Sequence, residues 1–289
     1  MSDADHPPDF EALKRLLDDP SPAVHEALLA EFRREGLPAL RRLRALADEP
    51  HGALAAPAAA MLRALGDPDH AGAFLRYIHG GVFDLEEGCL LFEKVMHPQV
   101  SANDFAEPLD AMAARAKELL NEDRSVRESC RVLNRVIFHE WGFRGDQGIF
   151  LNPAGSFIGR VLATRRGIPI SLCIIYLLVA RRCGVHIDAI GLPGRFMLGH
   201  HTGARDGFFI DCYDGGVFRS RNEVKLILLQ NGLPATDDFL APVDTSEVLC
   251  RCCRNLASQL EAVEDLPNAG IFLGFVRELE KTAGDDDTR

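Results

Sequence analysis

The run from Ile170 to Cys183 constrains the fold of this chain more than any other segment. Its side chains are apolar nearly all round a helix, and Gly184 directly after it is typical of a helix C-terminus. The longest apolar stretch, 170–180, is about half of the ~20 residues that a membrane-spanning helix needs. We therefore expect a central helix that is buried on every side, and no membrane partner.

Short strand patterns follow this helix. Residues 185–190 are a strand candidate that ends at the turn sequence 191–194, while 195–200 and 208–212 flank 203–207 as in a β-hairpin. A helix followed by antiparallel strands predicts an α+β fold rather than a doubly wound sheet.

Two helix starts before the central helix carry capping signatures. Asp84 stands three residues before Glu87, and Ser125 stands three residues before Glu128. Each pair precedes apolar residues at helical spacing. The sequence therefore predicts helices that begin after Asp84 and after Ser125.

The remaining core segments are read from composition and periodicity. Residues 143–157 are rich in Gly, Asn, Asp and Pro, as in a loop. Residues 222–230 and 246–281 have helical patterns, and 284–289 read as a frayed acidic tail.

The N-terminal region reads as short amphipathic helices separated by Asp-Pro or Glu-Pro pairs. Val24, Leu28 and Phe32 recur every four residues on one helix face. This arrangement resembles the stacked helix pairs of HEAT-type repeats, but no period is kept, and a helical region without repeat ancestry fits equally well. The expected helices are 10–17, 23–36, 40–47 and 54–65.

The chain thus divides into three expected parts. Residues 1–78 form a mostly helical, HEAT-like region, and 79–245 form the α+β core. Residues 246–289 supply C-terminal helices and the acidic tail.

Composition excludes several classes of function. With 32 Lys and Arg against 43 Asp and Glu, the net charge is -11, which disfavours a nucleic-acid partner. The N-terminus has neither a basic nor an apolar leader segment, so we expect a cytoplasmic protein. Eight cysteines without regular spacing read as reduced thiols. Phosphate-binding glycine motifs are absent, and we expect no cofactor.

The group Cys250, Cys252 and Cys253 is the one place where a metal comes into question. A zinc site usually combines two spaced ligand pairs, and no second Cys-x-x-Cys or His-x-x-x-His pair occurs. We interpret these residues as buried thiols on a helix and expect no metal.

Five ordered segments, together with Asp84-Leu85-Glu86-Glu87-Gly88, carry a family resemblance over roughly residues 80–230. The segments are Leu133-Asn134-Arg135-Val136, Trp141-Gly142-Phe143-Arg144-Gly145, Arg165-Arg166-Gly167-Ile168-Pro169-Ile170-Ser171-Leu172, Gly191-Leu192-Pro193-Gly194 and Phe209-Ile210-Asp211. With these segments the chain resembles the SirB-one family of bacterial transglutaminase-like proteins. The resemblance implies a papain-like core, in which a Cys at the start of a buried helix, a His on one strand and an Asp on the next form a thiol triad.

The nucleophile position of the family falls on Pro169, which offers no nucleophile. Ser171 and Cys173 are the nearest alternatives. We expect Ser171 to be a helix N-cap that accepts from free backbone N–H groups. Cys173, one turn inside the helix, is either a buried structural thiol or a displaced nucleophile.

The position of the triad histidine holds Arg195. A guanidinium with a pKa above ~12 cannot exchange a proton near neutral pH, so Arg195 cannot be a general base. His200 and His201 lie five and six residues along the strand, roughly 16 to 20 Å away at ~3.3 Å per residue. We expect them at the exposed end of the hairpin.

Asp211 is the one triad residue that the chain retains. A hairpin that turns around Ala204 places Arg195 opposite Cys212 and diagonal to Asp211, which predicts a charge-assisted pair between Arg195 and Asp211. Alternatively, Arg195 points to solvent and Asp211 caps the turn 213–216. We expect Ser171, Arg195, Asp211 and Tyr213 to form the binding surface.

Three functional hypotheses follow. The first is a degenerate, non-catalytic transglutaminase-like module, a pseudoenzyme that binds or scaffolds a protein partner. The second is an amidohydrolase or acyltransferase that uses Cys173 with an imidazole from His139 or His186. The third assigns binding to the N-terminal helices, whose segment 10–65 shows no aromatic anchor.

Overall fold

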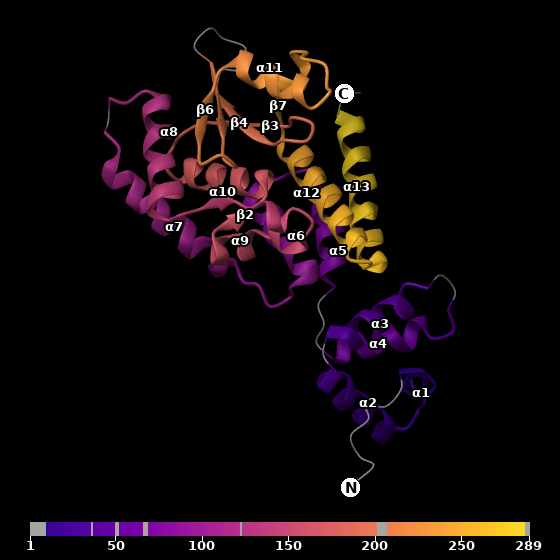
Figure 1. The fold of residues 1–289 in the computed structure, drawn as a ribbon. Helices are drawn as coiled ribbons and strands as arrows, with labels where there is room; N and C mark the ends of the chain where they lie inside the picture. Colours follow the sequence, from indigo (N-terminus) through magenta and orange to yellow (C-terminus); the bar gives the residue numbers. More distant parts are fainter. Residues whose placement is uncertain are drawn as a thin grey trace. The chain divides into compact units, whose positions relative to one another are not determined.

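The computed structural model describes residues 10–35, 37–49, 52–65, 69–121, 123–200 and 207–286. These residues fall into two compact units, with the boundary between Asp69 and His70. Figure 1 shows the ribbon of both units, coloured along the sequence.

Helices alone make up the described part of the first unit. Leu28 and Phe32 are buried in its apolar core and Val24 packs against them, which confirms the predicted helix face. Leu43 and Met61 from the next helices complete the same core. The helices are α1 (Phe10–Lys14), α2 (Pro22–Glu35), α3 (Leu37–Ala47) and α4 (Ala55–Ala64), close to the four expected.

The second unit surrounds a small antiparallel sheet with helices (Figure 1). The strands lie in the order β6-β5-β4-β3-β7, and two-residue strands β1 and β2 pair separately in parallel. The second unit is thus rich in helices and has one small antiparallel sheet, as the predicted α+β class implies. The strands are β1 (Arg144–Gly145), β2 (Arg166–Gly167), β3 (Asp188–Ile190), β4 (Met197–His200), β5 (Phe208–Asp211), β6 (Val217–Arg219) and β7 (Pro242–Val243).

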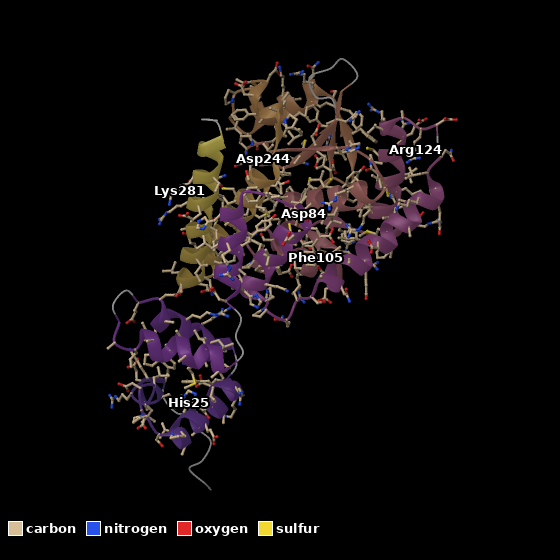
Figure 2. The ribbon with its side chains drawn as sticks, turned by 180° about the vertical axis from the view of Figure 1, so that it is seen from behind. His25, Asp84, Phe105, Arg124, Asp244 and Lys281 are labelled. Atoms are coloured by element: carbon tan, nitrogen blue, oxygen red, sulfur yellow. The ribbon has the colours of Figure 1, made fainter. Side chains whose placement is uncertain are left out.

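Ten longer helical segments accompany this sheet in the described residues, and Figure 2 shows their side chains filling the space between them. They are α5 (His70–Gly80), α6 (Leu85–Met96), α7 (Ala102–Leu119), α8 (Val126–Asn134), the π-helix η1 (Arg135–Glu140), α9 (Ile158–Thr164), α10 (Pro169–Arg182), α11 (Arg221–Gln230), α12 (Thr245–Ala262) and α13 (Leu266–Asp286). Short 3₁₀ turns add η2 (Gln147–Ile149), η3 (Pro153–Gly155) and η4 (Asp238–Leu240). None of the helices in the part of the chain described has the length and apolar composition that crossing a membrane requires.

Helix α10 is the predicted central helix. Eleven of its 14 residues are buried, and Tyr176 satisfies its buried hydroxyl by donating to the carbonyl of Cys130 at 3.1 Å. Gly184 follows in the left-handed conformation, with φ +67°, as a helix C-terminus favours. The prediction of a helix buried on all sides is therefore confirmed.

Both capped helix starts are confirmed. The side chain of Asp84 accepts from the backbone N–H groups of Glu86 and Glu87 before α6. Ser125 and Glu128 form a reciprocal capping box at α8. The stretch predicted as loop contains β1 and two 3₁₀ turns, and the predicted frayed tail is partly wrong, because α13 continues to Asp286. Residues 287–289 lie outside the described part.

The hairpin register differs by one residue from the prediction. Leu198 pairs with Ile210 and Gly199 with Phe209, so Arg195 precedes the ladder and is not opposite Cys212. Leu198 and Ile210 share the core on the α10 side, whereas Phe209 belongs to the core on the α11 side. A one-residue slip would pair side chains from opposite faces of the sheet, and burial of both faces excludes it.

A buried carboxylate holds the start of α9. Glu93 on α6 is 2% exposed, and its Oε2 accepts from the backbone N–H of Gly159 at 2.7 Å. The N-cap residue Phe157 offers no side-chain acceptor, so Glu93 caps this helix from a neighbouring one. Burial raises the pKa of Glu93 to about 7, although hydrogen bonds from Gly159 and Arg160 oppose the rise.

We predict that Glu93→Gln makes the stability of the protein less dependent on pH. A glutamate whose pKa rises on folding stabilises the protein below its unfolded pKa, and that contribution is lost as pH rises through about 7. The free energy of unfolding of the wild type should therefore fall relative to the variant by about 3 kcal/mol from pH 4.5 to pH 7. Urea unfolding at several pH values measures it.

Glu87→Gln on the exposed face of the same helix is the matched control, and it should leave the pH profile of the wild type unchanged. If the free energies of unfolding of the wild type and Glu93→Gln changed with pH in the same way, Glu93 would not be a buried helix cap that titrates near neutral pH.

Candidate functional site

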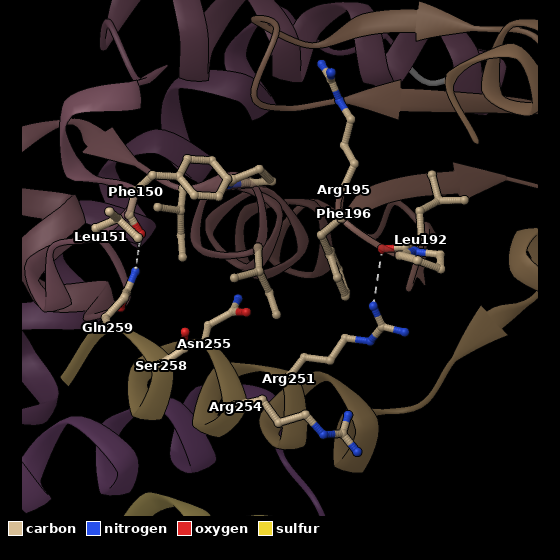
Figure 3. A pocket seen from close by; sticks show the side chains of 15 residues that line it. Phe150, Leu151, Leu192, Arg195, Phe196, Arg251, Arg254, Asn255, Ser258 and Gln259 are labelled. Carbon is tan, nitrogen blue, oxygen red and sulfur yellow. Dashed lines mark hydrogen bonds between the residues drawn. The ribbon is translucent and has the colours of Figure 1, made fainter. Parts of the chain in front are cut away.

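A cavity of about 470 Å³ lies at the N-terminal end of α10. Pro169 and the 192–196 segment form part of its wall, and Phe150 and Leu151 line it from the loop before α9. Helix α12 contributes the remaining wall. Figure 3 shows the 15 side chains that line this cavity. Two positions of the predicted triad, Pro169 and Arg195, are among them.

The chain enters α10 through Pro169. Proline suits the first helical position because its φ is fixed and its missing N–H would have no helical partner there. Ser171 is therefore the third helical residue, and the prediction that it is the N-cap is wrong. Its Oγ accepts from the N–H of Ile168 at 3.1 Å and donates to the Ile168 carbonyl at 3.0 Å. Ser171 is 1% exposed, and it does not line the cavity.

Cys173 lies behind the cavity wall. Its side chain has no exposed surface, and its Sγ lies 3.7 Å from the carbonyl oxygen of Phe196. The neighbouring thiol of Cys212 is also fully buried, and burial raises its pKa well above the ordinary value. A thiol that water and substrate do not reach is a core residue in this structure.

The imidazoles proposed for a displaced triad do not approach Cys173. His139 is exposed on η1, and His186 is exposed beyond the opposite end of α10. A helix of 14 residues is about 20 Å long, so His186 and the cavity are far apart. The structure therefore does not assemble the pairing of Cys173 with either histidine.

The two hairpin histidines have different outcomes. His200 ends β4 and is half-buried, with its ring centroid 5.5 Å from that of Phe208. It lies at the hairpin end of β4, as expected, but its side chain is not fully solvated, because it packs against Phe208, its cross-strand partner on β5. His201 lies outside the described residues.

Arg195 and Asp211 form the predicted ion pair. Nη2 of Arg195 donates to Oδ2 of Asp211, whose side chain is completely buried. The contact is single rather than bidentate. Arg219 approaches the same oxygen at 3.5 Å and pairs with Asp214 at 2.6 Å.

Asp211 also serves the turn that follows it. Its Oδ1 accepts from the backbone N–H of Asp214 at 3.3 Å. The ion pair and the turn cap, which the sequence left as alternatives, thus occur together. Arg195 does not point freely to solvent, since its side chain is 29% exposed and reaches the buried carboxylate.

Tyr213 lies beside this site rather than in it. Its ring meets the ring of Phe150 edge to face, with centroids 6.1 Å apart. Phe150 lines the cavity, but Tyr213 and Asp211 do not. Of the four predicted binding residues, the structure brings only Arg195 to the cavity wall.

The polar wall contributed by α12 was not predicted from the sequence. Arg251, Asn255 and Ser258 lie on one face of the helix, at spacings of four and three residues. Gln259 beside them accepts from Ser156 at 2.7 Å and donates to the carbonyl of Phe150 at 2.9 Å. In the sequence, the spacing of these polar residues between apolar ones is the signal that could have indicated a polar stripe on this helix.

The cysteines of α12 lie off this polar stripe. Cys250, Cys252 and Cys253 are buried, as predicted, and burial raises the pKa of Cys252 to about 12. Within the described ranges, no three His, Cys, Asp or Glu side chains are grouped so that they could hold a metal ion.

Comparisons with known proteins match the part of the chain that contains this site. The model of the transglutaminase-like superfamily matches residues 103–254, from α7 into α12. A UPF0162 protein of Xylella fastidiosa is 27% identical over 58% of this chain and 62% of its own length. A UPF0162 protein of Vibrio cholerae is 25% identical over 46% of this chain and 50% of its own length.

A eukaryotic relative covers a similar part of the chain. F-box only protein 21 of Mus musculus is 29% identical over 44% of this chain but only 21% of its own length. The chain spans about half to three fifths of the UPF0162 relatives. No solved structure matches it. Because the matching model covers more than half of the sequence, including α10 and the Arg195–Asp211 pair, the chain belongs to the transglutaminase-like superfamily.

Proposed function

We propose that this protein is a non-catalytic transglutaminase-like domain of the SirB-one family that binds a protein partner in the bacterial cytoplasm. The cavity at the start of α10 is its binding site. In this proposal the core keeps a papain-like arrangement, with α10 as the buried helix and β4 and β5 as the strands beside it. The N-terminal helical unit is an accessory part.

The observation that carries this proposal is the side chain at the histidine position of the triad. Arg195 is a permanent cation, and its guanidinium pairs with the buried carboxylate of Asp211. A general base must both accept and release a proton near neutral pH, which a guanidinium does not do. The retained carboxylate therefore neutralises a charge instead of orienting an imidazole.

The thiol side of the site supports the same proposal. Pro169 occupies the nucleophile position, and Cys173 is enclosed by the core. Catalytic thiols need an electropositive and partly exposed environment that stabilises the thiolate. None of the 15 side chains that line the cavity carries a thiol or an imidazole.

We predict that the purified protein does not turn over a glutamine-containing peptide in the presence of a primary amine or of water. Release of ammonia and mass spectrometry of the peptide measure this reaction. The rates measured with the wild type, with Cys173→Ala and with the control variant Cys130→Ala should all equal the rate without protein. Turnover by the wild type that Cys173→Ala abolishes and Cys130→Ala retains would overturn the proposal.

We also predict that Arg195 and Asp211 are coupled in stability. Asp211→Asn leaves two arginines without their buried carboxylate and should lower the free energy of unfolding by about 3 kcal/mol. Arg195→Met leaves the fully buried carboxylate with Arg219 alone and should also destabilise the protein, and the double variant should cost clearly less than the sum of the two. A double-mutant cycle by urea unfolding measures the coupling.

The exposed pair Lys281–Glu278 provides the control cycle, and its coupling should be smaller. Additive effects of the Arg195 and Asp211 substitutions would mean that the pair does not hold this part of the core together.

A further inference from the structure

We infer that the cavity at the start of α10 takes a peptide carboxylate next to an apolar side chain. This inference rests on the proposed function and deepens it by naming the class of ligand. It comes from the two chemically different walls of the cavity and from the kind of charge that lines it.

One wall of the cavity is apolar and accessible. Leu151 is 69% exposed and Phe150 is 44% exposed at its edge, and Phe196 and Pro169 continue this surface inward. Exposed side chains of this size beside a cavity gain free energy when a ligand covers them. The volume of about 470 Å³ is within the range of small-ligand sites.

The opposite wall offers hydrogen-bonding groups. Figure 3 shows the side chains of Asn255 and Ser258 directed from α12 toward the cavity. Both residues are exposed, and neither side chain makes a hydrogen bond with any residue that the structure describes. They are therefore available to a ligand without loss of an internal contact.

Arg251 supplies the charge on this wall. Its Nε donates to Glu247 at 2.7 Å and its Nη1 donates to the carbonyl of Leu192 at 3.2 Å. These two bonds fix the guanidinium at the cavity, while Nη2 packs closely against Gly191 and makes no hydrogen bond in the described part of the chain. A fixed guanidinium with a free N–H edge is a good carboxylate donor.

The remaining lining residues favour an anion rather than a cation. No Asp or Glu is among the 15 lining residues, and the carboxylates that pair with the three lining arginines, those of Asp211, Glu247 and Glu280, lie outside the lining. Arg195 and Arg254 also line the cavity, with guanidinium groups that Figure 3 shows pointing away from it. The N-terminal end of the α10 dipole adds to the positive potential.

Three small probes test this inference on the full chain. They are N-acetyl-Ala-Leu with a free carboxylate, the same peptide as its amide, and N-acetyl-Leu-Glu-amide, which moves the carboxylate to a side chain. Titrations followed by NMR shifts of the Asn255 and Ser258 side-chain and backbone signals measure the affinities. We expect at least one of the two acids to bind about tenfold more tightly than the neutral amide, as one charge-assisted hydrogen bond implies.

Two variants test which side chains cause the preference for the acids over the amide. Arg251→Gln should bring the affinity of the acids close to that of the amide, whereas Arg131→Gln on the exposed face of α8 should not. Asn255→Leu removes no internal hydrogen bond and should also weaken the acids, so it replaces Arg251→Gln if that variant fails to fold. The tighter of the two acids shows whether a chain end or an acidic side chain is the source of the carboxylate.

Equal affinities for acids and amide, binding that both variants leave unchanged, or no binding of any probe would overturn this inference. Mass spectrometry of the same samples separates that result from failure of the proposed function. A peptide amide that is hydrolysed or exchanged in a Cys173-dependent manner would show a working enzyme, whatever the preference for acids.

Discussion

Burial of α10 on all sides is the constraint on which the rest of the second unit depends. An apolar helix without a polar face is stable in water only when other elements cover it completely. Helices α6, α7, α8 and α9 and strands β3 and β4 contact it. At its N-terminal end the buried residues Pro169 and Ile170 line the cavity.

In the proposed function, this placement lets the site keep the shape of a thiol triad without its chemistry. Pro169 starts the helix as well as a cysteine would, because the first helical position needs no backbone donor. Arg195 and Asp211 form an ion pair, and Arg219 lies beside the same carboxylate. The fold thus needs a group complementary to the buried carboxylate, but it does not need that group to exchange protons.

The sequence predicted the parts of this structure that depend on local chemistry. The buried helix follows from its composition, and the starts of α6 and α8 follow from capping residues at fixed spacing. The Arg195–Asp211 pair followed from opposite charges near each other in a hairpin. Neighbouring residues signal the helix and the caps, whereas the ion pair joins positions 16 apart and needed the hairpin as well.

Features that depend on distant residues were missed. Glu93 caps α9 across 66 positions, and its burial is not visible from its own helix. The register of β4 and β5 depends on cores on both faces of the sheet. At the end of the π-helix η1, the backbone N–H of Trp141 donates a hydrogen bond to the carbonyl of Val136. The residue types give no signal for this spacing. The polar stripe of α12 could not be assigned to a site from the sequence, because only the fold brings it to the same cavity as Pro169.

The proposed function requires that no thiol near this cavity is activated. The most direct measurement is the rate at which each of the eight cysteines of the native protein reacts with iodoacetamide at pH 6.5, followed by peptide mass spectrometry. We expect Cys173 to react as slowly as the buried Cys130, Cys212 and Cys253. Rapid labelling of Cys173 alone, at a rate that unfolding does not explain, would contradict it.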